Sequence, residues 1–225
     1  MARAARAELT DAELARLNEE LEGEPASAIV AWAVARFGDR LCLAASMQDA
    51  VLIDIAVGID PEVEVVFIDT GYHFPETLDT VERIRDRHGL NLRVMRPDVP
   101  PDPPLWQVDP VNCCSGLRVA LLDAALAGKE AWMTGLRRAE APTRADVPVV
   151  GRDRRGLVKV NPLATWSAVD VTGYIADHDV IVNPLMQRGY LSIGCAPCTE
   201  PVAPGDDSRS GRWAGLDKTE CGLHE

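Results

Sequence analysis

Six cysteines are the residues whose type and spacing point most directly to chemistry. Cys195 and Cys198 form a C-x-x-C turn, which sets two thiolates on one side of a loop. Such a pair suits the edge of a metal or cluster site, and the same spacing also occurs in thioredoxin-like redox pairs. Because the motif follows the loop residues 192–194, we favour metal or cluster binding, with a redox pair or two inert cysteines as alternatives.

A second pair, the adjacent Cys113 and Cys114, changes this balance. Zinc sites favour two to four residues between ligands, whereas an iron–sulfur cube has irons at several corners, which two neighbouring thiolates can each reach. The two pairs are separated by 80 residues. Together they favour a [4Fe–4S] cluster over structural zinc, and the remaining alternative is a chance doublet at the start of a helix.

The last cysteine, Cys221, is followed by only four residues, and His224 lies three positions further on. A thiol in a glycine-containing tail is exposed enough to react, and nearby cationic groups favour its nucleophilic thiolate form. The alternative is an incidental surface thiol. Cys42 lies inside an apolar run, so we expect it to be a small residue of the core.

Three loops follow predicted strands at their carboxyl ends, where open α/β sheets bind ligands: 46–49, 69–72 and 134–138. The first loop has no glycine, so it is neither a dinucleotide fingerprint nor a Walker loop. Arginines gather nearby, because six of them fall within the nineteen residues 137–155. Guanidinium groups match phosphate and sulfate oxygens, and in an acidic chain such a local cationic site suits a small dianion.

The elements that must position these residues alternate between strand and helix patterns, which is typical of a Rossmann-like, doubly wound parallel sheet in the α/β class. Helix patterns begin at Thr10 and near Pro25. Six prolines in residues 97–110 indicate a loop. The further predicted helices are 50–57, 75–88, 111–126 and 170–177, and the predicted strands are 41–45, 63–68, 92–95, 131–134 and 157–160.

Composition limits the possible functions. The 225 residues are 47% hydrophobic with a formal net charge of −12, so we expect no nucleic-acid partner. No apolar run approaches the roughly 18 residues that span a bilayer, and we expect no membrane partner and a cytoplasmic location. We expect N-terminal helices over 1–38 packed on the core, a nucleotide- and cluster-binding domain over 39–200, and a mobile catalytic tail over 201–225.

The two cysteine pairs and the C-terminal ECGLH motif resemble the assimilatory adenylyl-sulfate reductases, the iron–sulfur branch of the phosphoadenylyl-sulfate reductase family, and are most similar to the actinobacterial members. The resemblance covers roughly residues 40–224. Further matching segments are Ile68–Phe74, Thr134–Arg138, Ala141–Arg144, Asn161–Leu163 and Gly211–Trp213.

The resemblance implies an adenine nucleotide α-hydrolase-like fold and one [4Fe–4S] cluster held by Cys113, Cys114, Cys195 and Cys198. It implies that adenylyl sulfate and reduced thioredoxin give sulfite, AMP and oxidised thioredoxin through an S-sulfonate on Cys221. The residues that we expect to bind substrate are Ser46, Asp69, Thr70, Gly71, Gly135, Arg137, Arg138, Arg144, Arg209, Arg212 and His224.

The sequence departs from the family pattern at several positions. Arg118 stands where the family has a lysine that links cluster and substrate, Ser46 stands where small glycines are common, and Ala141 replaces a frequent serine. The alternatives are a phosphoadenylyl-sulfate reductase and a non-catalytic four-cysteine zinc module whose tail is an interaction peptide. An ATP pyrophosphatase is disfavoured, because residues 44–46 are Ala-Ala-Ser where that group has Ser-Gly-Gly.

Overall fold

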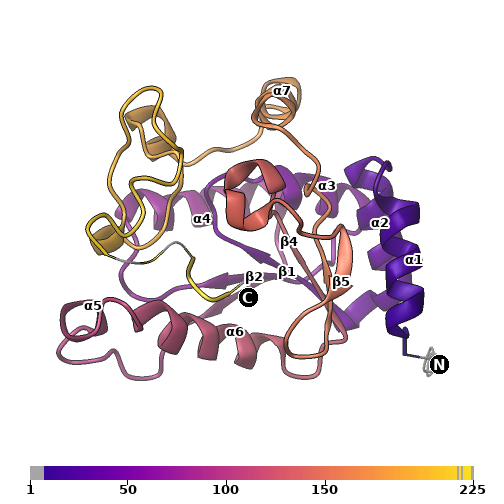
Figure 1. Cartoon of the computed structure of the whole chain (residues 1–225), viewed down its shortest axis with the longest axis horizontal. Helices are drawn as coiled ribbons and strands as arrows, with labels where there is room; N and C mark the ends of the chain where they lie inside the picture. The colour runs from indigo at the N-terminus through magenta and orange to yellow at the C-terminus, as the bar shows by residue number, and fades with distance from the viewer. Residues whose placement is uncertain (1–7, 217, 219, 224–225) are drawn as a thin grey trace.

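A six-stranded, mostly parallel sheet forms the centre of the protein in the computed structural model, which describes residues 8–216, 218 and 220–223 (Figure 1). The sheet order is β3-β2-β1-β4-β6-β5. The α/β class and the parallel sheet are confirmed. The strands are β1 (Leu41–Ala45), β2 (Val65–Ile68), β3 (Leu92–Met95), β4 (Ala131–Thr134), β5 (Val150–Arg152) and β6 (Val158–Val160).

The edge strand β5 was not predicted. It pairs antiparallel to β6, with Val150 opposite Val160 and Arg152 opposite Val158. Three residues with a central glycine carry too little periodicity to be recognised as a strand. Pairing with β6 and contact with the first helix stabilise β5, so tertiary contacts alone define it.

The helices lie close to their predicted ranges. Thr10 and Ser167 each cap a helix through a reciprocal capping box, and Gly89 ends another in the left-handed conformation. None of the helices in the described ranges has the length and apolarity that a bilayer crossing requires. They are α1 (Asp11–Leu21), α2 (Ala26–Phe37), α3 (Val51–Ile59), α4 (Pro75–His88), α5 (Leu105–Val108), α6 (Val119–Leu126) and α7 (Ala168–His178).

Both faces of the sheet are covered, because successive residues of a strand point to opposite sides. Leu41 and Leu43 of β1 join one core with α2, α3 and α4. Cys42, between them, joins a second core with α6 and with Trp132 of β4. Cys42 is fully buried, as expected, and burial raises the pKa of its thiol to about 11.

The C-terminal segment adds to this second core. Trp213 lies within the segment that we expected to be a mobile tail, and its side chain is only 2% exposed. Leu223 and Cys221 are buried in the same cluster. The yellow chain end accordingly runs back toward the sheet and α6 (Figure 1). An isolated tryptophan among Gly, Ser and Arg has no periodicity, so its burial is invisible in the sequence.

Two further local differences concern the region before α6. The proline-rich segment 97–110 contains the short helix α5, although we predicted no element there. The predicted helix 111–126 begins instead with a π-helical turn, Cys114–Arg118, and continues as α6. The wider turn changes the direction of side chains near the cysteine doublet, and such turns are frequent at functional sites.

Ile29 of α2 is 1% exposed and tests whether the N-terminal helices belong to the main core. We expect Ile29→Ala to lower the free energy of unfolding by about 2–4 kcal/mol, because it leaves a cavity that the surroundings only partly fill. Urea denaturation should show one shifted transition. Val169→Ala, at a side chain that is 79% exposed, is the control, with a change within about 0.5 kcal/mol. A separate early transition in Ile29→Ala would show that the helices unfold independently.

Candidate active site

A cavity of about 170 Å³ opens at the carboxyl ends of β1 and β4. These neighbouring strands mark the point where the sheet order reverses, since β2 and β3 lie beyond β1 while β6 and β5 lie beyond β4. Parallel sheets bind ligands at this switch point because the loops after the two strands separate there. The cavity occupies the ligand edge that the sequence predicts.

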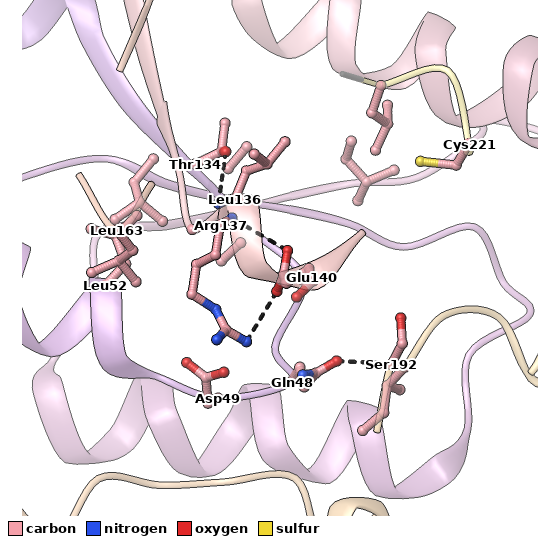
Figure 2. Close-up of a pocket in the computed structure, with 18 of the residues that line it drawn as sticks. Gln48, Asp49, Leu52, Thr134, Leu136, Arg137, Glu140, Leu163, Ser192 and Cys221 are labelled. Carbon is pink, nitrogen blue, oxygen red and sulfur yellow. Dashed lines mark hydrogen bonds and ion pairs between the residues drawn. The ribbon is translucent and has the colours of Figure 1, made fainter. Parts of the chain in front are cut away.

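One end of the cavity is apolar and flanked by the loop after β1. Leu52 and Leu163 lie on the same side in Figure 2, and Leu136 also lines the cavity. Ser46 and Gly135, which we expected to bind substrate, also line it. A planar apolar ring fits such a wall, because aliphatic side chains and an aromatic face lose little by leaving water together.

The loop after β1 is held by the segment before Cys195. Gln48 Oε1 accepts a hydrogen bond of 2.9 Å from the Ile193 backbone N–H. Met47 adopts a left-handed conformation with φ 60° while its side chain is fully buried. A non-glycine residue in this region signals a constrained backbone. The position of the loop is therefore determined by contacts with residues far away in the sequence.

A charged pair lies beside this loop. Arg137 points into the cavity above Asp49 and pairs with Glu140 at 3.2 Å (Figure 2). Burial raises the pKa of Asp49, although a hydrogen bond from the Val51 N–H and the nearby Arg137 oppose the rise. Arg137 thus places a cation at the apolar end of the cavity.

Arg138 does not enter the cavity, contrary to expectation. Its guanidinium pairs with Glu22, with one contact of 2.9 Å, and donates to the Val147 carbonyl at 2.8 Å. Arg137 has an extended backbone, whereas Arg138 begins a 3-10 helical turn, so the two side chains leave the chain in different directions. Arg138 instead ties the N-terminal helices to the loop after β4.

Four arginines line the opposite end of the cavity together with the Cys221 thiol: Arg118, Arg144, Arg209 and Arg212. The last of these stacks over the ring of Trp213 at 4.4 Å and donates to Ser192 Oγ at 3.3 Å. Burial and the neighbouring arginines lower its pKa to about 10. This concentration of buried positive charge indicates an anion site.

Glycine makes room for one of these arginines. A Cβ atom on Gly194 would collide with the guanidinium of Arg212, so no other residue fits at this position without displacing the arginine. Arg212 reaches the cavity only because the residue before Cys195 has no side chain.

Glu220, which the sequence reasoning did not assign, binds two of the arginines. Its carboxylate accepts from Arg144 Nε at 2.8 Å and Nη2 at 2.9 Å, from Arg209 Nη2 at 3.1 Å, and from Thr143 Oγ1 at 3.1 Å. Burial raises the pKa of Glu220, but the hydrogen bonds and charges of Arg144, Arg209 and Thr143 together outweigh burial, and the pKa lies below its usual value. The only sequence signal is its place next to Cys221.

The four cysteines of the two pairs converge beside this end of the cavity. The Cys113 thiol lies within electrostatic reach of those of Cys114, Cys195 and Cys198; burial foremost, together with these neighbouring thiols, raises its pKa to about 11. The Cys195 loop is held against the loop after β2, since the Ala196 N–H donates to the Tyr72 carbonyl at 2.7 Å.

Four cysteine thiols are the donor set that an iron–sulfur cluster uses. Among the residues that the structure describes, no three His, Cys, Asp or Glu side chains converge tightly enough to hold one metal ion. Zinc requires four ligands about 2.3 Å from one centre, whereas the corners of a cube lie further apart.

A buried cation lies among these thiols. Arg118 Nε is buried and has no hydrogen-bond partner among the described residues. Burial lowers the pKa of Arg118, but the surrounding thiols, Cys221 and Cys195 foremost, outweigh burial and raise it. The Arg118 guanidinium thus has cysteine sulfur atoms on one side and faces the cavity on the other.

Asp69, Thr70 and Gly71 lie outside the cavity lining, contrary to expectation. Asp69 Oδ2 pairs with Arg96 at 2.8 Å and its Oδ1 accepts from the Gly71 N–H at 2.9 Å. Thr70 Oγ1 lies 3.2 Å from Cys195 Sγ. Because β2 is one strand away from the switch point, its loop meets the Cys195 segment instead of the cavity.

The arrangement places a thiol, an anion site and an apolar wall in one cavity. A thiolate formed at Cys221 is positioned to attack a ligand whose charged group lies among the arginines. His224, which we expected to bind substrate, lies outside the described residues.

Comparisons with known proteins agree with this geometry. Residues 40–201 match the model of the phosphoadenosine phosphosulfate reductase domain. An adenosine 5'-phosphosulfate reductase of Streptomyces coelicolor is 50% identical over 217 residues, covering 93% of this chain and 92% of the relative. The protein of that name from Mycobacterium tuberculosis is 46% identical over 235 residues, covering 93% and 92%.

Solved structures show the same architecture. A phosphoadenylyl-sulfate reductase of Candida auris, solved as a phosphate complex, has a TM-score of 0.75 at 26% identity and covers 88% of this chain and 100% of that one. An FMN adenylyltransferase of Candida glabrata has a TM-score of 0.61 at 13% identity, covering 87% and 68%, and shares the fold. The chain belongs to the phosphoadenosine phosphosulfate reductase family.

Proposed function

We propose that this protein reduces adenylyl sulfate to sulfite and AMP in sulfate assimilation. The observation that carries the proposal is the Cys221 thiol lining a cavity at the sheet switch point together with four arginines. A nucleophile, a dianion site and a wall for an adenine ring are the three parts that this reaction needs. The relatives named adenosine 5'-phosphosulfate reductase support the same substrate.

Binding orients the substrate along the cavity. The adenosine lies at the end with Leu52, Leu136 and Leu163, and the phosphosulfate lies at the arginine end. Arg144, Arg209 and Arg212 surround the sulfate, because guanidinium forks match its oxygens and offset its charge. Ser46, Gly135 and Arg137 are the proposed contacts near the loops after β1 and β4, and we keep His224 as a candidate from the tail.

The chemical step is an attack of Cys221 Sγ, as the thiolate, on the sulfur of the sulfate group. A bond forms between the two sulfur atoms, the bond from sulfur to the phosphate oxygen breaks, and AMP leaves with that electron pair. An S-sulfonate remains on Cys221. Arg118, Arg209 and Arg212 stabilise the charge on the sulfate oxygens as the bond breaks.

Release of sulfite requires two electrons from a dithiol, for which we propose thioredoxin. One thioredoxin thiolate attacks Cys221 Sγ and expels sulfite, and the second thiol then resolves the mixed disulfide. Thioredoxin leaves oxidised and Cys221 regains its thiol. Since Cys221 is only 7% exposed, the tail over 201–225 must open for a protein to reach it. Because thioredoxin and its reducing system keep cytoplasmic thiols reduced, we propose a cytoplasmic location for the enzyme.

One [4Fe–4S] cluster is the proposed cofactor, with Cys113, Cys114, Cys195 and Cys198 as its ligands. When bound, it would supply a polarisable anion beside the catalytic cavity. Arg118 is suited to lie between that anion and the substrate, and a hydroxyl such as Thr70 Oγ1, close to Cys195 Sγ, orients a ligand thiolate.

Cys221→Ser tests the nucleophile. We expect the variant to keep its iron and to bind AMP, but to form no sulfite from adenylyl sulfate and thioredoxin, because a serine hydroxyl is not ionised at neutral pH. The wild type, given substrate without thioredoxin, should gain roughly 80 Da on its C-terminal peptide, as one SO₃ group adds to the thiol. An adduct on another cysteine, or normal sulfite production by the variant, would refute the mechanism.

Cys195→Ser and Cys198→Ser test the cofactor. Each variant should lose iron and acid-labile sulfide together, because a hydroxyl is a poor ligand for iron. The absorption at about 400 nm should be lost with them. Cys42→Ala is the matched control, since Cys42 is buried in β1 and should leave the iron content unchanged. Colourless wild-type protein with one zinc per chain would instead support the zinc module.

The nucleotide preference has its own test. We expect the rate of sulfite formation to be higher with adenylyl sulfate than with phosphoadenylyl sulfate, as the names of the relatives at 45–50% identity suggest. The measurement compares kcat/KM for the two nucleotides with the same thioredoxin. A clear preference for the phosphorylated nucleotide would reassign the substrate within the same family.

A further inference from the structure

Glu220 joins the described part of the tail to the segment after β4, where Thr143 and Arg144 lie, and it also pairs with Arg209 of the tail itself. Its carboxylate accepts four hydrogen bonds, three of them from the guanidiniums of Arg144 and Arg209. The side chains of Glu220, Arg144 and Arg209 are only 16%, 10% and 13% exposed. A partly buried, bidentate pair of this kind is worth more than a surface salt bridge, because solvent screens it less.

The contact matters for the Cys221 thiol because of where Glu220 lies in the chain. Glu220 directly precedes Cys221, whereas Arg144 follows β4 and lies 76 residues away. A contact one residue from the thiol determines where the thiol lies, since one peptide unit spans about 3.8 Å. Cys221 therefore takes its place at the cavity through the ion pair of its neighbour.

The same arginines also line the cavity, so the carboxylate holds groups that face the ligand. Arg144 is shared between Glu220 and Glu140, and Arg209 stacks at 5.6 Å from Trp213. Both guanidiniums are thus already fixed in direction before a ligand arrives. Preorganised cations lose less side-chain freedom on binding than free ones do.

We propose that Glu220 is a positioning residue, which latches the tail to Arg144 after β4, with Arg209 of the tail as a second partner, and so holds the Cys221 thiol at the cavity. Its consequence for catalysis rests on the proposed function. With the latch closed, Cys221 is placed for attack. With the latch broken, the tail is released and an S-sulfonate on Cys221 becomes accessible to a dithiol protein.

The first test uses the resting full-length protein and no substrate. In Glu220→Gln, hydrogen exchange of the C-terminal peptide should be roughly tenfold faster, because a neutral amide loses the charge-assisted bonds. Alkylation of Cys221 by iodoacetamide should rise by a similar factor at pH values where the thiol is fully ionised. The alkylation rates are compared on the high-pH plateau of the pH profile. Removing a nearby negative charge would by itself shift only the midpoint of that profile and leave the plateau rate unchanged.

Two comparisons make this test specific. Glu22→Gln removes an ion pair of the same type, between Glu22 and Arg138, and should leave both readouts unchanged. Arg144→Gln should open the tail as Glu220→Gln does, and the double variant should show no further increase, because both single changes break one contact. Unchanged exchange and an unchanged plateau in Glu220→Gln, or full additivity in the double variant, would overturn the latch.

The second test follows a single turnover with adenylyl sulfate. Glu220→Gln should form the adduct on Cys221 roughly tenfold more slowly than the wild type, while thioredoxin releases sulfite from it at least as fast. If neither protein forms an adduct but the resting tail still opens, the latch stands and the proposed function fails. If the wild type forms the adduct and Glu220→Gln matches it in every readout, the proposed function stands and the latch is refuted.

Discussion

The close approach of four guanidinium groups at one end of a small cavity is the constraint on which the rest of the site depends. Arg118, Arg144, Arg209 and Arg212 come from three separate segments and repel one another. Burial and the neighbouring arginines lower the pKa of Arg212 to about 10, which reflects the unfavourable energy of bringing these charges together. Such a site forms only if nearby anions and aromatic rings offset the repulsion.

Side chains from several segments of the chain provide these partners for the arginines. Glu140, four residues before Arg144, and Glu220 of the tail bind that arginine from two sides. Trp213 places its ring beneath Arg212, and the cysteine thiols surround Arg118. A protein with a net charge of −12 thereby keeps one compact region of positive potential, and its acidic surroundings disfavour large polyanions while a small dianion still fits.

The sheet topology explains why these segments meet. Reversal of the strand order between β1 and β4 opens a gap at their carboxyl ends, and the chain after Cys195 returns to cover it. The loop after β2 is shifted by one strand, so it supports the cysteines while the loops after β1 and β4 face the ligand. Because β2 lies one strand further out than β1, the residues after β2 belong to the cysteine site and the residues after β1 belong to the ligand cavity.

The sequence alone determined much of the framework. Helix patterns from Thr10 and near Pro25 and short apolar runs located most of the helices and the parallel strands to within a few residues, because these signals are local. The cysteine spacing and the ECGLH motif indicated a cluster and a nucleophile, since those residue types have few other uses together. The six arginines within residues 137–155 indicated a binding site for an anion.

Only the tertiary structure decided which residues act together. Arg137 faces the cavity while Arg138 binds Glu22, and no sequence pattern separates two adjacent arginines. Trp213 is buried although its segment has the composition of a loop, and Glu220 finds a partner 76 residues away. Local propensity depends on neighbours along the chain, whereas burial and ion pairing depend on neighbours in space. The register of the sheet and the return of the tail set those spatial neighbours.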